Sequence, residues 1–210
     1  LLTVREMLAA IGEAHSAFNT VLLLKSRGVN ARFVDLTGWR EDELAPLDDR
    51  IRAAFDGLEP QRELLIVPGY TKCEEGLVRL YDRGYSEITT SRIAVITGAR
   101  EAVIHKEYHL SSADPKVVGP ERVAPIGRTN YDVADQLSNI GMEAIHPRAA
   151  KGLRQQGIPL RVRNTFEPEH AGTLIDSEYL SEVPCVEIVA GCREVLAVEV
   201  FEPPTRIGDR

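Results

Sequence analysis

The feature that most constrains the fold is the alternation of short aliphatic runs with amphipathic helical patterns. Leu64 to Val67 is an uninterrupted apolar run, typical of a strand covered on both faces. Leu47 to Phe55 instead has apolar residues at helical spacing. The same patterns predict further strands at 31–36, 102–104, 160–162 and 172–175, and helices at 131–140 and 147–156. Strands alternating with helices predict an α/β fold, a three-layer αβα sandwich with a mainly parallel sheet.

The first residues predict a long helix. Thr3 to Glu6 matches a capping box, apolar residues follow at helical spacing, and Gly28 ends the pattern. The polar stretch 12–16 is expected to interrupt this helix. A second helix is predicted to start at Ser86 as its N-cap and to end at Gly98.

The pattern changes from Pro184 onward. Two β-rich runs, 185–190 and 195–201, follow without a helix between them. This predicts a first domain at 1–176, a linker at 177–183 and the start of a second domain at 184–210. Because the chain starts inside a helical pattern without a methionine and stops just after strand-like sequence, we expect both domains to be incomplete.

Composition narrows the class of protein. The chain is 43% hydrophobic but only 6% aromatic, which suits a globular protein with an aliphatic core. A net charge of -7 argues against a nucleic-acid partner, because binding phosphate backbones needs clustered Lys and Arg. Cys73, Cys185 and Cys192 form no Cys-x-x-Cys pair, so neither a disulfide framework nor a zinc site is indicated. With no membrane-length apolar run, we expect a cytoplasmic protein that binds no membrane and holds no metal of its own.

One loop has the chemistry of an anion site. It runs from Asp82 to Glu87, just before a predicted helix whose first N–H groups have no intrahelical partner. Arg83 can hold a carboxylate bidentately, Gly84 allows close backbone approach, and Ser86 can bind further oxygens. The alternative is an ordinary glycine turn with a solvated arginine, and the local sequence alone favours it.

Three other polar stretches are candidates. Glu13, in the stretch 12–16, could meet an ammonium group, or this stretch could be a surface helix junction. The loops 111–116 and 141–146 could face a nucleotide, or Asp114, Lys116 and His146 could be a turn former, a solvated charge and a packed residue. No GxGxxG, Walker, GxSxG or HExxH motif occurs, which removes the common dinucleotide, P-loop, hydrolase and zinc-protease readings.

Taken together, these segments resemble the aspartate kinases of the amino-acid kinase family. The matching stretches, in chain order, are GEAHS at 12–16, VPGY at 67–70, DRGYSEIT at 82–89, SSADPKVV at 111–118, IGMEAIHPRA at 140–149 and RNTFEPEHAGTLI at 163–175. The resemblance implies an aspartate site made of Glu13, Arg83, Gly84, Tyr85 and Ser86. It implies a nucleotide site made of His105, Lys106, Ser111, Lys116, Glu143 and Ala144.

Several positions depart from the family pattern. The family usually has Thr-Asp at His105 and Lys106, and Lys at Glu143. Tyr85 and Glu87 replace a more usual glycine and aspartate. These departures, together with the GEAHS and HKEYHLSSADP stretches, are similar to the aspartate kinases associated with ectoine biosynthesis.

The resemblance also implies a reaction. The γ-phosphoryl group of ATP passes to the β-carboxylate of L-aspartate, with Mg²⁺ on the phosphates, in a homo-oligomer whose regulatory ACT modules follow residue 175. The family supplies its catalytic lysine from an N-terminal Lys-x-Gly-Gly-Thr-Ser loop. The 210-residue sequence does not contain that loop, so we expect no catalytic residue within this chain and no activity of the chain alone. The alternatives are a non-catalytic binding or regulatory module and a kinase of glutamate or a carbamate.

Overall fold

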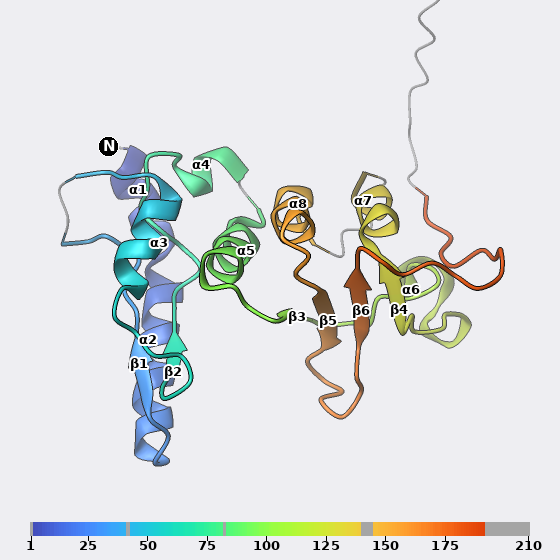
Figure 1. The fold of residues 1–210 in the computed structure, drawn as a ribbon, viewed down its shortest axis with the longest axis horizontal. Coiled ribbons are helices and arrows are strands. Elements are labelled where there is room, and N and C mark those ends of the chain that lie inside the picture. Colours follow the sequence, from blue (N-terminus) through green and yellow to red (C-terminus); the bar gives the residue numbers. More distant parts are fainter. Residues whose placement is uncertain (1, 41–42, 82, 140–144, 192–210) are drawn as a thin grey trace, which may run out of the picture.

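The computed structural model describes residues 2–40, 43–81, 83–139 and 145–191 as a mixed α/β fold (Figure 1). The helices are α1 (Leu2–Ala9), α2 (Ile11–Ser26), α3 (Leu47–Phe55), α4 (Leu77–Tyr81), α5 (Tyr85–Thr97), α6 (Pro115–Val118), α7 (Tyr131–Asn139) and α8 (Pro147–Gln155), with a 3-10 turn at Pro120–Arg122. The strands are β1 (Ala31–Phe33), β2 (Leu64–Ile66), β3 (Ala102–Lys106), β4 (Arg128–Asn130), β5 (Leu160–Asn164) and β6 (Thr173–Asp176). The described helices include none with the length and apolar character needed to cross a bilayer.

The strands form two mainly parallel sheets. β1 pairs with β2 in parallel, and the larger sheet has the order β3-β5-β6-β4. Within it β3 and β5 are parallel, with Ala102 opposite Leu160, and β4 and β6 are also parallel. β5 and β6 are antiparallel, because the loop between them is too short for the crossover that parallel pairing requires.

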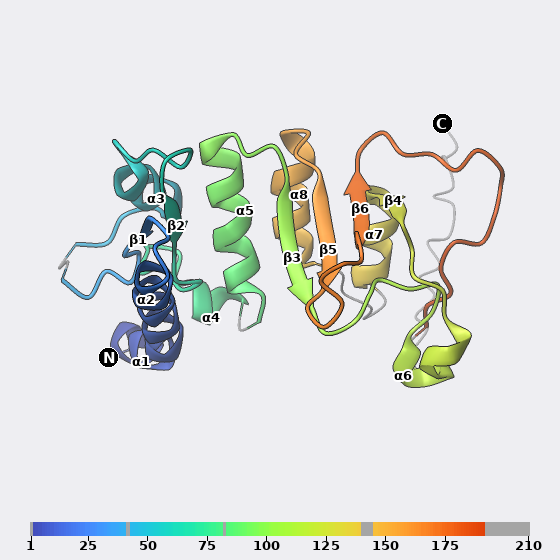
Figure 2. The same cartoon turned by 90° about the horizontal axis from the view of Figure 1, so that it is seen from below.

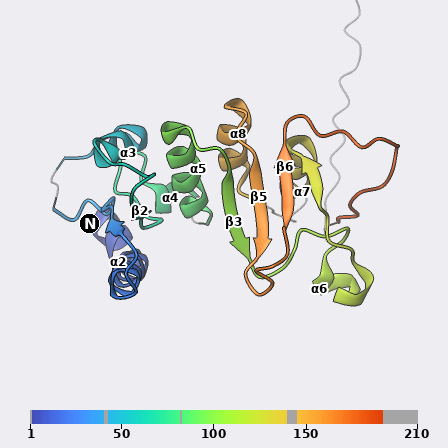
Figure 3. The same ribbon diagram turned by 60° about the horizontal axis from the view of Figure 1, so that its bottom comes forward.

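The helices are divided between the two faces of the strands. Figure 3 shows α3, α5, α8 and α7 in a row on one face, with α2 on the other side of β1 and β2. Figure 2 shows the four-stranded sheet lying in front of α8 and α7, with α5 beside β3. The α/β class with a mainly parallel sheet is confirmed, and three layers are present where α2 lies across β1 and β2.

The core lies between the four-stranded sheet and the helices. Leu160 and Ile175 are 0% exposed, and Leu153 of α8 packs against the same cluster. Burying one such side chain is worth about 1.5–3 kcal/mol. α5 is held on both sides, because Ser91 Oγ donates to Ala149 O at 2.8 Å and Arg92 forms a two-point ion pair with Asp48 of α3.

Most helix boundaries follow the sequence pattern, with two corrections. α3 spans the predicted residues, and Gly98, at φ 62°, ends α5 as predicted. The predicted first helix corresponds to α1 and α2, which are separated by a break at Ala10. The stretch 12–16 therefore lies inside α2 and does not interrupt it. α5 begins at Tyr85 with Gly84 as its N-cap, so the prediction of Ser86 as N-cap is wrong.

Two strand predictions also need correction. Leu64 is 48% exposed, because β2 pairs only with β1 among the described residues. The run 185–190 forms one isolated bridge, between Ala113 and Val189, and no strand. The run 195–201 lies outside the described residues. The division into domains at 1–176 and 184–210 stays a prediction.

Candidate functional site

The carboxylate of Glu13 organises the first candidate site. Its Oε2 accepts a hydrogen bond from the backbone N–H of Tyr70 at 2.8 Å. Its Oε1 accepts from the hydroxyls of Tyr85 at 2.8 Å and Ser86 at 3.3 Å. The carboxylate thus joins the first turn of α2 to the segment after β2 and to the start of α5. A carboxylate offers about four lone-pair sites, so Glu13 can still accept an N–H from a ligand.

Gly69 allows these elements to approach closely. A Cβ atom at this position would lie 2.3 Å from Ser86 Oγ and 2.9 Å from Glu13 Oε2. Both distances are far below van der Waals contact, so only glycine fits without moving the site. The requirement for glycine in the VPGY stretch is therefore steric, which the sequence alone did not reveal.

Tyr85 supplies a neutral hydroxyl donor to the site. Burial raises the pKa of Tyr85 to about 12, and its hydrogen bond to the Glu13 carboxylate acts in the same direction. Burial also raises the pKa of Tyr70 to about 12. Tyr85 therefore stays protonated near neutral pH.

The start of α5 has the features of an anion site. Its N-cap, Gly84, has φ +79° and gives no side-chain cap to the first-turn amides. These amides carry partial positive charge from the helix. A Cβ at position 84 would come within 2.9 Å of the His146 ring, so this turn packs directly on the start of α8. The side chain of Arg83 is exposed beside the turn, while Asp82 lies outside the described residues.

A second candidate site lies beyond the carboxyl end of β3. A cavity of about 190 Å³ is lined there by Lys106, Ser111 and Lys116, among others. Ser111 is buried and its hydroxyl donates to His109 O at 3.1 Å. The Lys116 ammonium lies 5.6 Å from the centre of the Tyr108 ring. Cationic, hydroxyl and aromatic groups at a strand end suit a nucleotide.

Among the other predicted nucleotide residues, His105 does not line this cavity. His105 is exposed, and strand alternation places its side chain on the opposite face of β3 from Lys106. The cavity lining does not include His105. Glu143 and Ala144 lie outside the described residues.

Glu87 links the two candidate sites, which sequence reasoning did not foresee. One carboxylate oxygen pairs with Lys106 Nζ at 2.9 Å, and the other accepts from the backbone N–H of His146 at 2.5 Å. Next to it, the Tyr81 ring meets the His146 ring edge-on at 5.3 Å and accepts the Arg148 guanidinium over its face. The sequence signal that could have indicated this link is that Glu87 is an acidic residue in the first turn of α5, directly after the polar loop.

A second missed contact borders the cavity. His109 Nε2 lies 3.1 Å from the carboxylate of Glu167, and the His109 and His170 rings are 4.1 Å apart. The His109 contact lowers the pKa of Glu167. These side chains connect the loop after β3 to the β5–β6 hairpin.

The sequence from residue 2 to residue 164 matches the amino acid kinase family. That match covers well over half of the chain. The chain belongs to the amino acid kinase family.

Several aspartate kinases are similar to this amino acid kinase. Aspartate kinase Ask_Ect of Stutzerimonas stutzeri is 63% identical over 96% of the chain, which spans 42% of that protein. Aspartokinase 1 of Bacillus subtilis is 27% identical over 97% of the chain, which spans 52% of it. The chain therefore corresponds to about half, or less, of the length of these relatives.

Solved structures show the same amino acid kinase fold. Aspartokinase III of E. coli, in complex with aspartate and ADP, aligns with a TM-score of 0.68 and 21% identity, covering 86% of this chain and 42% of that one. The UMP kinase of Bacillus anthracis aligns with a TM-score of 0.58 and 14% identity, covering 83% and 69%. Kinases of different substrates thus share the fold, so the substrate has to be argued from the site.

Proposed function

We propose that this chain is part of an aspartate kinase. In the proposed reaction an oxygen of the L-aspartate β-carboxylate attacks the γ-phosphorus of Mg-ATP, the bond to the ADP oxygen breaks, and 4-phospho-L-aspartate and ADP leave. The observation that carries the proposal is the Glu13 carboxylate facing the uncapped start of α5, next to Arg83. The 63% identity to an aspartate kinase supports it.

The proposed aspartate site matches the charges of a zwitterionic acid. The α-ammonium group meets the Glu13 carboxylate, and a carboxylate of the ligand meets the Arg83 guanidinium and the first-turn amides of α5. Gly84 lets the ligand approach the backbone, and the hydroxyls of Tyr85 and Ser86 fix the Glu13 carboxylate from the other side.

The proposed nucleotide site uses cations at the end of β3. Lys106 and Lys116 contact the phosphates of Mg-ATP, and Ser111 shapes the loop between them. His105, Glu143 and Ala144 remain proposed contacts of the nucleotide. Catalysis then depends on positioning and charge neutralisation without a covalent enzyme intermediate. We propose no catalytic residue within the chain's 210 residues and expect no turnover by them alone.

The proposed setting is a biosynthetic pathway in the cytoplasm. The product would feed the amino acids made from aspartate or, in line with the departures in the sequence, ectoine. The complete protein would be a homo-oligomer with ACT-type regulation.

The test is isothermal titration of L-aspartate and Mg-ATP into the complete gene product, with Arg83→Ala as the decisive variant. Losing one charge-assisted contact costs about 1.5–3 kcal/mol, so aspartate affinity should fall by roughly 10- to 150-fold. Mg-ATP affinity should stay within about twofold, since Arg83 lies outside the cavity at β3. A variant that phosphorylates aspartate as well as the parent protein does would show that this loop is not the substrate loop.

The second candidate function is a non-catalytic ligand-binding or regulatory module. An assay of ADP production separates the two functions. Aspartate-dependent ADP production by the complete gene product supports the kinase, whereas aspartate binding without turnover supports the module.

A further inference from the structure

Glu87 contacts two elements through its two carboxylate oxygens. It stands in the first turn of α5, immediately after Tyr85 and Ser86. One oxygen holds Lys106 Nζ at 2.9 Å, at the end of β3, and the other holds the N–H of His146, the N-cap of α8. The side chains of Glu87 and Lys106 are only 20% and 32% exposed, so water screens this pair less than a surface pair.

Lys106 is the end of this network that reaches the cavity. It lines the cavity together with the charged residues Glu107, Asp114 and Lys116. The Asp114 carboxylate accepts the backbone N–H of Lys116 at 2.8 Å and so holds the turn that carries Lys116. Lys106 and Lys116 are the lysines of the lining that an anionic ligand of this cavity would meet.

The ion pair fixes a side chain that is otherwise mobile. A lysine has a long, flexible stem, and ordering it on ligand binding lowers affinity. Because Glu87 holds the ammonium before the ligand arrives, part of that ordering is already complete. The same carboxylate also fixes the turn of α5 that contains Tyr85 and Ser86, so the two candidate sites share one anchor.

We infer that Lys106 contacts the polyphosphate of the nucleotide and that Glu87 is the positioning residue that holds Lys106 and couples it to the aspartate loop. This inference rests on the proposed function. The cation at this position is one of the departures from the family pattern noted above, in which an aspartate is usual.

The experiment uses the complete gene product and titrates Mg-ATP and L-aspartate separately. Lys106→Met keeps the length of the side chain and removes its charge. It should lower the affinity for Mg-ATP about tenfold and change the affinity for L-aspartate by no more than about twofold. Glu87→Gln keeps an acceptor for the N–H of His146 but loses the ion pair with Lys106. It should lower the affinity for Mg-ATP about fivefold and the affinity for L-aspartate about threefold. In the double variant, which carries both substitutions, Glu87→Gln should lower the affinity for Mg-ATP by less than a further factor of about two relative to Lys106→Met alone.

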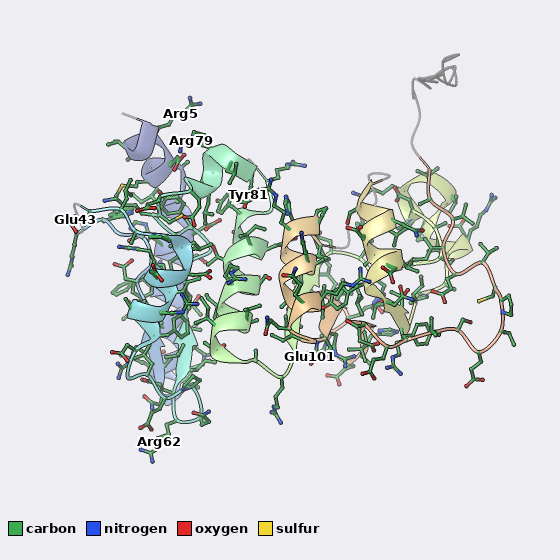
Figure 4. All side chains as sticks on the ribbon, turned by 45° about the horizontal axis from the view of Figure 1, so that its top comes forward. Arg5, Glu43, Arg62, Arg79, Tyr81 and Glu101 are labelled. Carbon is green, nitrogen blue, oxygen red and sulfur yellow. The ribbon has the colours of Figure 1, made fainter. Side chains whose placement is uncertain are left out.

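Two further variants separate positioning from folding. Lys106→Arg should recover most of the Mg-ATP affinity, because it restores a cation next to Glu87. Glu101→Gln removes a matched ion pair with Arg161, at 2.8 Å, from the other end of the same strand. Figure 4 labels Glu101 at the end of α5 opposite Tyr81. Both affinities should stay within about twofold in this control.

The outcomes are distinct. Unchanged Mg-ATP affinity in Lys106→Met, or fully additive losses in the double variant, would overturn the inference while leaving the aspartate kinase proposal intact. A loss in Glu101→Gln equal to that in Glu87→Gln would also overturn it, because the effect would then come from the sheet. A parent protein that binds neither ligand would refute the proposed function itself.

Discussion

The two candidate sites are built by opposite means. In the proposed aspartate site, Glu13 bonds to Tyr70, Tyr85 and Ser86, which lie 57, 72 and 73 residues further along the chain. In the proposed nucleotide cavity, Ser111 bonds to the carbonyl of His109 and Asp114 to the N–H of Lys116, each across two residues. The first site exists only when distant elements have packed, whereas local turns can form much of the second.

This difference bears on tolerance to change. The proposed aspartate site is half-buried and tightly packed around Gly69, so a substitution there displaces several groups at once. Lys116 and Tyr108 are exposed and can adjust. We therefore expect large, selective losses in the first site and small, salt-dependent losses at the exposed Lys116 of the second.

The largest effect is expected for Gly69→Ala, which tests whether the first site is as tightly packed as the geometry indicates. The new methyl group collides with Ser86 and Glu13. Overpacking costs about 1–3 kcal/mol, and disturbing the bonds of a charged group costs about 1.5–3 kcal/mol. Aspartate affinity, measured by calorimetry, should fall at least about 70-fold, with Mg-ATP affinity within about threefold.

Gly12→Ala is the matched control for this prediction. Nothing lies within 4 Å of a Cβ at position 12, which is in α2 next to Glu13. Alanine is more favourable than glycine by about 0.5–1 kcal/mol in a helix interior and by less in the first turn, where Gly12 lies, so thermal stability should rise slightly while binding is kept. Equal losses in both variants would contradict the steric argument.

An intermediate effect is expected for Tyr85→Phe, which removes one hydroxyl from the same site. A hydrogen bond to a charged group is worth about 1.5–3 kcal/mol, so aspartate affinity should fall about tenfold or more. The pKa of Tyr85 is raised from 10.0 to about 12, so the hydrogen bond contributes fully below pH 10 and is lost as pH rises through 12. The ratio of parent to variant affinity should therefore be flat from about pH 6 to about pH 9, and a ratio that narrows within that range would refute the assigned donor.

The smallest effect is expected for Lys116→Met, which examines the open site. Because Lys116 is exposed, its contact with a phosphate is worth about 0.5–1 kcal/mol, or roughly two- to fivefold in Mg-ATP affinity. Salt should reduce the difference between parent and variant, because it screens exposed charges. Titrations at low and high ionic strength measure this. A loss as large as that of Gly69→Ala would remove the contrast between the sites.

The sequence predicts those parts of the molecule that local chemistry determines. Periodicity gives the span of α3, and the left-handed glycine at 98 gives the end of α5. The polar loop before α5 is correctly located, but its cap is not. The backbone at Gly84 already takes φ +79°, so the helix starts before Ser86 can cap it.

The remaining features depend on partners that no local pattern reveals. The propensity of residues 185–190 for a strand is real, but among the described residues only Val189 finds a bridge partner. Leu64 is apolar yet exposed, since burial depends on neighbouring strands. Glu87 reads as an ordinary acidic residue at a helix start, and its bonds to Lys106 and His146 cross 19 and 59 residues.

The bonds of Glu13 cross the boundary between the two sheets. Glu13 belongs to α2, which lies on β1 and β2, whereas Tyr85 and Ser86 open α5, which packs on α8 beside the four-stranded sheet. The Glu13 carboxylate therefore connects the part of the molecule around β1 and β2 to the part around the four-stranded sheet. An acid bound between Glu13 and the α5 amides would connect α2 to α5 a second time, so ligand binding would also join the two sheets more firmly.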